Sequence, residues 1–141
     1  MSRIYWDTML FVYLIEDNAV FGSKVRHIYE RMQKRGDTLS TSTLTYGEAL
    51  TGPLKGGDSQ LADQMRQLFH GDEVELLPFL RSTAELYASI RAKGTASAPD
   101  AIHLATAAEN HTDVFLTNDK RLHHLAISGI QFIAGLDGTI F

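Results

Sequence analysis

Apolar residues recur along the chain in two patterns, short runs and longer stretches with helical spacing. The runs at Ile4–Trp6 and Val114–Leu116 are short and apolar, as expected for buried strands. Val25, Ile28 and Met32 share one face of a helix if the intervening segment is helical. The pattern therefore predicts strands that alternate with helices.

Glycine and proline residues help to place the ends of these elements. We expect five strands, at Ile4–Trp6, Thr38–Thr41, Val74–Leu77, Val114–Leu116 and Gln131–Ile133. We expect helices at Thr8–Ile15, Val20–Lys34, Thr43–Leu50, Ser59–Phe69, Thr83–Lys93, Ala98–Asn110 and Lys120–Ala126. This alternation predicts an α/β fold, a three-layer α/β/α sandwich with a mainly parallel five-stranded sheet, in a single domain spanning residues 1–141.

Composition narrows the class of protein. The 141 residues are 44% hydrophobic and 21% charged, as in folded globular proteins. No apolar run approaches the roughly 20 residues that cross a bilayer, and the first residues lack the apolar stretch of a signal peptide. We therefore expect a cytoplasmic protein with no membrane partner. The absence of cysteine excludes disulfides, thiolate chemistry and cysteine-based zinc sites, and a net charge of −4 argues against coating of nucleic acid by charge alone.

Four acidic residues are predicted to reach the same edge of the sheet. Asp7 directly follows the first strand, and Asp119 follows the strand Val114–Leu116 after a short turn. Glu48 lies in the early turns of the helix that leaves the second strand, and Asp100 lies near the start of the helix that leads into the fourth. Ligands bind outside the carboxyl ends of parallel strands, so we expect the four carboxylates to meet there.

Carboxylates crowded into one pocket repel each other, which raises their pKa values or opens the site. Mg²⁺ and Mn²⁺ prefer oxygen ligands and relieve this repulsion. A cation held there can activate water and stabilise charge on a phosphodiester. The sequence thus predicts a metal-binding and catalytic site, with Mg²⁺ or Mn²⁺ as cofactor, at Asp7, Glu48, Asp100 and Asp119.

Each acid also has a structural interpretation. Asp7 and Asp119 can cap the helices that follow them. Ser97 and Asp100 have the spacing of a capping box, and Glu48 can form a solvated salt bridge. Capping and metal binding can coexist. The arrival of all four acids at one edge favours a metal site over purely structural roles.

Four stretches that contain these acids resemble the PIN-domain family, specifically the VapC-type toxin ribonucleases of VapBC toxin–antitoxin systems. The stretches are Tyr5–Thr8, Thr43–Ala49, Pro99–Ala107 and Phe115–Asp119. The resemblance depends on their order and spacing and covers essentially the whole chain. It implies a PIN-like fold, a Mg²⁺- or Mn²⁺-dependent endoribonuclease with RNA as substrate, a homodimer, and a cognate antitoxin that occupies the groove by the active site.

The resemblance also implies residue roles. The family's acidic positions coincide with the four acids above, and family members vary most around Asp119. The residues expected to support the acids are Thr8, Thr117 and Asn118.

Basic and aromatic residues near the acids are candidates for contact with RNA. Those that could bind substrate phosphates are Arg91, His103, Lys120 and Arg121. For His103, a packed or solvated role is the favoured alternative. Tyr5, Trp6, Phe11 and Tyr13 could stack on bases, but core or dimer packing is favoured.

Other functions stay open at this point. A haloacid-dehalogenase-type phosphatase carries a second Asp two residues after the first, where this chain has Met9. A phospho-receiver domain needs paired acids near its first strand, and Asp7 stands alone. A PIN-like scaffold that binds a partner without catalysis is a third alternative, which the intact acid set disfavours. The apolar helices at Thr8–Ile15 and Ser59–Phe69 exceed what we expect one small sandwich to bury, which favours a homodimer.

Overall fold

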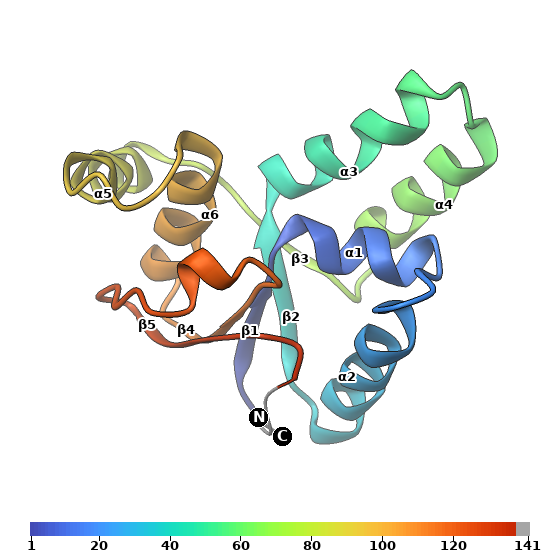
Figure 1. The fold of residues 1–141 in the computed structure, drawn as a ribbon, viewed down its shortest axis with the longest axis horizontal. Coiled ribbons are helices and arrows are strands. Elements are labelled where there is room, and N and C mark those ends of the chain that lie inside the picture. Colours follow the sequence, from blue (N-terminus) through green and yellow to red (C-terminus); the bar gives the residue numbers. More distant parts are fainter. Residues whose placement is uncertain (138–141) are drawn as a thin grey trace.

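A computed structural model describes residues 1–137 as three layers built around one sheet (Figure 1). Its strands lie in the order β3-β2-β1-β4-β5, and every neighbouring pair is parallel. The strands are β1 (Arg3–Trp6), β2 (Thr38–Ser42), β3 (Glu75–Leu77), β4 (Thr112–Leu116) and β5 (Ile130–Ala134). The predicted five-stranded parallel sheet is confirmed.

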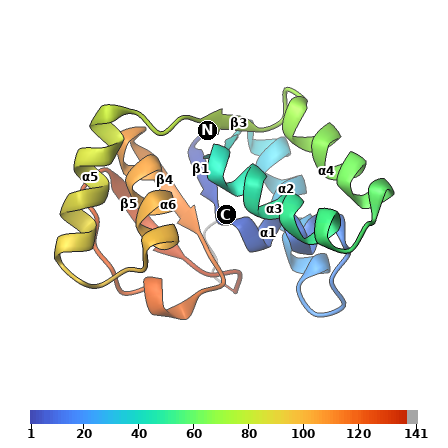
Figure 2. The same ribbon diagram turned by 90° about the horizontal axis from the view of Figure 1, so that it is seen from above.

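Helices cover both faces of this sheet. Helices α5 and α6 lie on one side and α1 to α4 on the other (Figure 2). The bounds are α1 (Thr8–Ile15), α2 (Gly22–Arg35), α3 (Thr43–Lys55), α4 (Ser59–His70), α5 (Arg81–Ala92) and α6 (Ala98–Glu109), followed by a 3₁₀ turn, η1 (Lys120–Leu122). No helix of residues 1–137 is long and apolar enough to span a membrane.

The central strands supply both halves of the core because side chains alternate between the faces of a strand. Ile4 and Trp6 pack in the cluster beneath α1 to α4, whereas Tyr5 and Phe115 pack in the cluster beneath α6. Tyr5, Trp6 and Phe11 are completely buried. They are core residues, as the favoured alternative predicted, and are closed to bases.

The helix predicted to end before Gly52-Pro53 continues to Lys55. Pro53 lies in the last turn and is buried, where the missing N–H costs the helix only one hydrogen bond. The Gly56 N–H restores the helical pattern by donating to the Gly52 carbonyl. The glycine and proline pair therefore does not stop this helix.

The helix predicted at Lys120–Ala126 is also wrong, because only Lys120–Leu122 is helical and its turn is 3₁₀. Backbone N–H groups here bond three residues back, as that of Leu125 does to Leu122. One nitrogen of His123 lies 2.9 Å from the Thr117 carbonyl oxygen and ties the segment to the end of β4. The other predicted bounds agree within two residues.

Candidate active site

The four predicted acids line one pocket of about 480 Å³ at the carboxyl edge of the sheet. Asp7 comes from the end of β1, Glu48 from α3, Asp100 from the first turn of α6, and Asp119 from the loop after β4. The predicted supporting residues Thr8 and Asn118 also line it, as does His103. Topology alone therefore brings these residues to one place.

Asp7 is held at both carboxylate oxygens. Its Oδ1 accepts a hydrogen bond from the Thr8 N–H at 2.8 Å, so Asp7 caps α1 as the structural interpretation predicted. Its Oδ2 accepts from the Thr117 hydroxyl at 2.7 Å. That hydroxyl also accepts from the Asp119 N–H at 3.0 Å. Thr117 therefore connects the two acids, in keeping with its predicted supporting role.

We expect Thr117→Val to lower the free energy of unfolding by about 1–2 kcal/mol, because it leaves polar groups around a fully buried side chain without their partner. Chemical denaturation measures the change. The control is Thr106→Val, because the buried Thr106 hydroxyl donates only within α6, to the Ile102 carbonyl. Equal losses in both variants would contradict this role of Thr117.

Two neighbouring side chains, Thr8 and His103, hold Glu48. Its Oε1 accepts from the Thr8 hydroxyl at 2.7 Å and lies 2.8 Å from His103 Nε2. The hydrogen bond to His103 lowers the pKa of Glu48, and that from Thr8 adds to the effect, while partial burial opposes it. Glu48 therefore stays ionised and available to a cation.

His103 is packed inside the protein, with 3% of its surface exposed. Its Nδ1 lies 2.7 Å from the Tyr5 hydroxyl and its Nε2 contacts Glu48. Because both ring nitrogens are engaged, the structure favours the packed alternative, and binding of substrate phosphate by His103 stays a prediction. Sequence reasoning missed the contact with Tyr5, and no spacing in the sequence signals it.

Asp119 forms an ion pair with Arg121. The guanidinium donates to both carboxylate oxygens of Asp119, at 2.9 and 2.6 Å, and this hydrogen bonding lowers the pKa of Asp119. Arg121 Nη2 also lies 3.9 Å from Asp100 Oδ2. The Asp100 N–H is capped by the Ser97 hydroxyl at 3.3 Å. Arg121 thus lies beside two acids of the pocket without lining it, and its partners are those acids.

Arg91 and Lys120 are likewise not among the residues of 1–137 that line the pocket. Arg91 donates to the Ala96 carbonyl at 2.9 Å and so anchors the loop before α6. Lys120 is exposed to solvent beside Asp119. A contact of Arg91 or Lys120 with substrate phosphate therefore stays a prediction.

An apolar wall completes the pocket. Met9, Val12 and Tyr13 of α1 face it, together with Pro99. The three α1 residues have the i, i+3, i+4 spacing of one helical face. Sequence reasoning missed this wall because it assigned Tyr13 to packing, although the spacing that begins at Met9 was an available signal.

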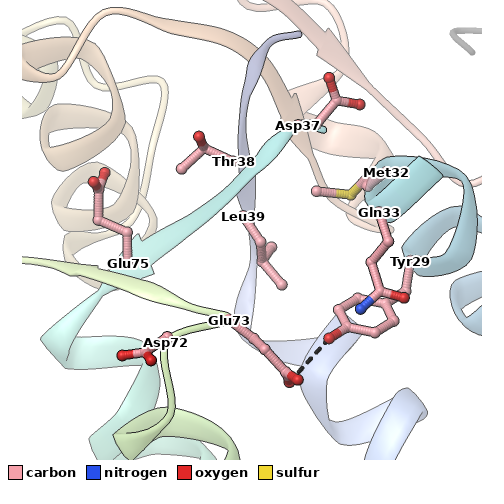
Figure 3. Close-up of a pocket in the computed structure, with 9 residues that line it drawn as sticks. All are labelled: Tyr29, Met32, Gln33, Asp37, Thr38, Leu39, Asp72, Glu73 and Glu75. Carbon is pink, nitrogen blue, oxygen red and sulfur yellow. Dashed lines mark hydrogen bonds between the residues drawn. The ribbon is translucent and has the colours of Figure 1, made fainter. Parts of the chain in front are cut away.

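A second pocket contains several acids but serves packing (Figure 3). It lies at the amino ends of β2 and β3. In Figure 3 Glu73 points toward Tyr29, whose hydroxyl donates to it at 3.0 Å. Asp37 accepts from the Ser2 N–H at 2.8 Å and from Arg35 Nε at 2.9 Å. These acids fix the N-terminus and α2, so the pocket at the carboxyl edge is the candidate active site.

The donor chemistry of that pocket suits a hard divalent cation, because it offers carboxylate oxygens and no sulfur. Within residues 1–137, however, no three acidic or histidine side chains stand close enough together to hold an ion. A cation held by three or more of these carboxylates therefore requires them to approach one another.

A sequence model of the PIN domain matches residues 4–128. The chain belongs to the PIN domain family. This confirms the resemblance of the four acidic stretches. A search of curated proteins gave no significant match.

Solved structures with the same PIN fold come from VapBC systems. VapBC2 of Rickettsia felis, bound to a DNA fragment from its promoter, has a TM-score of 0.75 at 17% identity, covering 94% of this chain and 98% of that one. DNA-bound VapBC of Salmonella typhimurium has a TM-score of 0.68 at 22% identity, covering 96% and 99%. VapC20 of Mycobacterium tuberculosis, a sarcin-ricin loop cleaving toxin, has a TM-score of 0.65 at 15% identity, covering 79% and 86%.

Proposed function

We propose that this PIN domain is a Mg²⁺- or Mn²⁺-dependent endoribonuclease that acts as the toxin of a toxin–antitoxin pair. The observation that carries the proposal is the convergence of four carboxylates, from four separate elements, on one pocket. The family match and the likeness to VapBC proteins support RNA as the substrate and an antitoxin as the partner.

The residues that would hold the cation are Asp7, Glu48, Asp100 and Asp119. A divalent cation bound there would supply an activated water and offset the charge that develops on the phosphodiester. The Thr117 hydroxyl donates to Asp7, and the Thr8 hydroxyl donates to Glu48. These bonds hold the two carboxylates in place.

Arg121 has to release Asp119 before that carboxylate can bind a cation. Its side chain is 80% exposed, and ion pairs in solvent contribute little to stability, so the release is easy. Arg121 and the neighbouring Lys120 would then be available for phosphates that flank the cleaved bond.

A comparison of substrates tests the reaction class. We expect the purified protein with Mn²⁺ to cut single-stranded RNA internally and to leave a phosphomonoester intact. A matched variant, Glu73→Gln, removes an acid of the other pocket and is expected to cut RNA at the rate of the parent. Release of phosphate from the monoester, with no RNA cleavage, would instead support a phosphatase, and binding of RNA without cleavage would support a scaffold.

Expression in a bacterial host tests the toxin role. The protein alone should arrest growth, and Asp7→Asn should not. Coexpression with the product of a short neighbouring reading frame should restore growth, because an antitoxin would occupy the groove at the pocket. Growth arrest by both the parent and Asp7→Asn would contradict a toxin that acts by cleavage.

We also expect a homodimer, for a different reason from that given by the sequence. The apolar residues of α4 are largely taken up by the core, where Met65 and Phe69 are buried. Exposed apolar side chains gather instead around the start of α5, at Phe79, Leu80 and Leu86. Light scattering should give twice the 15.7 kDa mass of the chain. The mass of one chain at micromolar concentration would argue against the dimer.

A further inference from the structure

We infer that Tyr5 and His103 are positioning residues that orient Glu48 so that one of its carboxylate oxygens stays free for the pocket. This inference rests on the proposed function, because it assigns Glu48 to the cation. It concerns two residues outside the set of four acids, one in the first strand and one in a buried helix.

Three side chains from three elements form one connected chain of hydrogen bonds. The Tyr5 hydroxyl of β1 lies 2.7 Å from His103 Nδ1 of α6. His103 Nε2 lies 2.8 Å from Glu48 Oε1 of α3. We call this chain of hydrogen bonds from Tyr5 through His103 to Glu48 the relay. It runs from the buried core to the pocket.

The chemistry of Glu48 sets the direction of one hydrogen bond of His103. An ionised carboxylate only accepts hydrogen bonds, so Nε2 carries a proton and donates to Glu48. The Tyr5 hydroxyl forms the hydrogen bond at Nδ1. Burial raises the pKa of Tyr5 to about 12, so the phenol keeps its proton.

Packing fixes the relay in space. Tyr5 is completely buried and stacks on Phe115, with ring centroids 4.9 Å apart and planes only 6° from parallel. The His103 ring meets the edge of Tyr5 at 5.9 Å. Neither ring can turn without disturbing the core, so the direction of the hydrogen bond to Glu48 is set by the sheet.

The consequence lies in how the two oxygens of Glu48 are used. Oε1 accepts from both His103 and the Thr8 hydroxyl. In the part of the chain that the structure describes, Oε2 accepts no hydrogen bond. The relay thus occupies one oxygen and leaves the other for a cation. His103 Nε2 also lies 3.8 Å from Asp7 Oδ1, so the ring separates two acids of the site.

Mn²⁺ affinity, measured by calorimetry, tests the inference without recourse to cleavage. We expect His103→Ala to weaken Mn²⁺ binding by roughly 10- to 100-fold, the usual effect of removing a residue that orients a metal ligand. His103→Gln should recover part of the affinity, because its amide can donate to Glu48. Tyr5→Phe, which keeps the ring and removes the hydroxyl, should weaken binding by up to about tenfold. The control Thr106→Val, in the same helix, should bind as the parent does.

The tautomer of His103 gives a second readout on metal-free protein. Nitrogen NMR should show a proton on Nε2 in the parent. A ring whose only proton is on Nδ1 would overturn the inference, because Nε2 could not then donate to Glu48. If His103→Ala does not fold, the Mn²⁺ affinity of Tyr5→Phe and the NMR measurement still test whether Tyr5 and His103 position Glu48.

The two proposals fail in different ways. If the parent binds no Mn²⁺, the proposed function is wrong and the relay has nothing to position. If the parent binds Mn²⁺ and folded His103→Ala and Tyr5→Phe bind it equally well, only the relay is wrong.

Discussion

Asp7→Asn is expected to lower RNA cleavage by roughly two orders of magnitude or more, because it removes a carboxylate that the cation needs for its chemistry. The fold should survive the change. Asn caps a helix about as well as Asp, so its oxygen can still accept from the Thr8 N–H. Cleavage is measured at saturating Mn²⁺ beside Glu73→Gln, which should cut at the parental rate. Retention of activity in Asp7→Asn would reduce Asp7 to a helix cap.

The same variant tests Asp7 as a ligand through stability. In metal-free buffer, the free energy of unfolding of the variant should lie within about 1 kcal/mol of the parental value, because loss of a charge relieves repulsion while loss of the Oδ2 acceptor weakens the bond to Thr117. With Mn²⁺ the parent should become the more stable protein, because it gains more binding energy. Thermal melts in EDTA and in saturating Mn²⁺ measure both effects. An equal rise in melting temperature for the two proteins would show that Asp7 is not a ligand.

Removal of metal is expected to abolish cleavage altogether. Excess EDTA should stop the reaction, and added Mg²⁺ or Mn²⁺ should restore it, because the cation is the proposed source of the activated water and of charge stabilisation. Attack by water on phosphorus should leave a 5′-phosphate and a 3′-hydroxyl, which end-labelling of the products identifies. Full activity in EDTA would contradict the metal mechanism.

The products also show whether water or the RNA's own 2′-hydroxyl attacks the phosphorus. A 2′,3′-cyclic phosphate would mean that the RNA's own hydroxyl attacks, and it would contradict the water route even if metal is needed.

Much of the fold could be predicted because the signals are local. Short apolar runs such as Ile4–Trp6 mark strands, and the order of strands and helices places Asp7, Glu48, Asp100 and Asp119 at one edge by topology. The structure places all four in one pocket. The errors are also local. Pro53 lies in the last turn of α3 without ending the helix, and the segment after Asp119 closes in a 3₁₀ turn.

The contacts that refine the site could not be predicted, because they depend on packing between distant segments. Tyr5 and His103 are 98 positions apart and meet only because α6 packs on the face of β1 to which Tyr5 points. The ion pair of Asp119 with Arg121 is close in sequence, but nothing in the spacing shows that the guanidinium turns back toward the acids. Topology delivers residues to an edge, and side-chain packing decides their partners.

The central claim is that the four carboxylates gather around a divalent cation, although they stand apart without one. A crystal structure of the protein with Mn²⁺, with the anomalous signal of manganese recorded, tests this most directly. We predict a peak in the pocket at the carboxyl edge, bonded to Asp7, Glu48, Asp100 and Asp119, with Arg121 turned away from Asp119. The absence of a peak there at saturating Mn²⁺, or a peak only in the pocket of Glu73 and Asp37, would contradict the account.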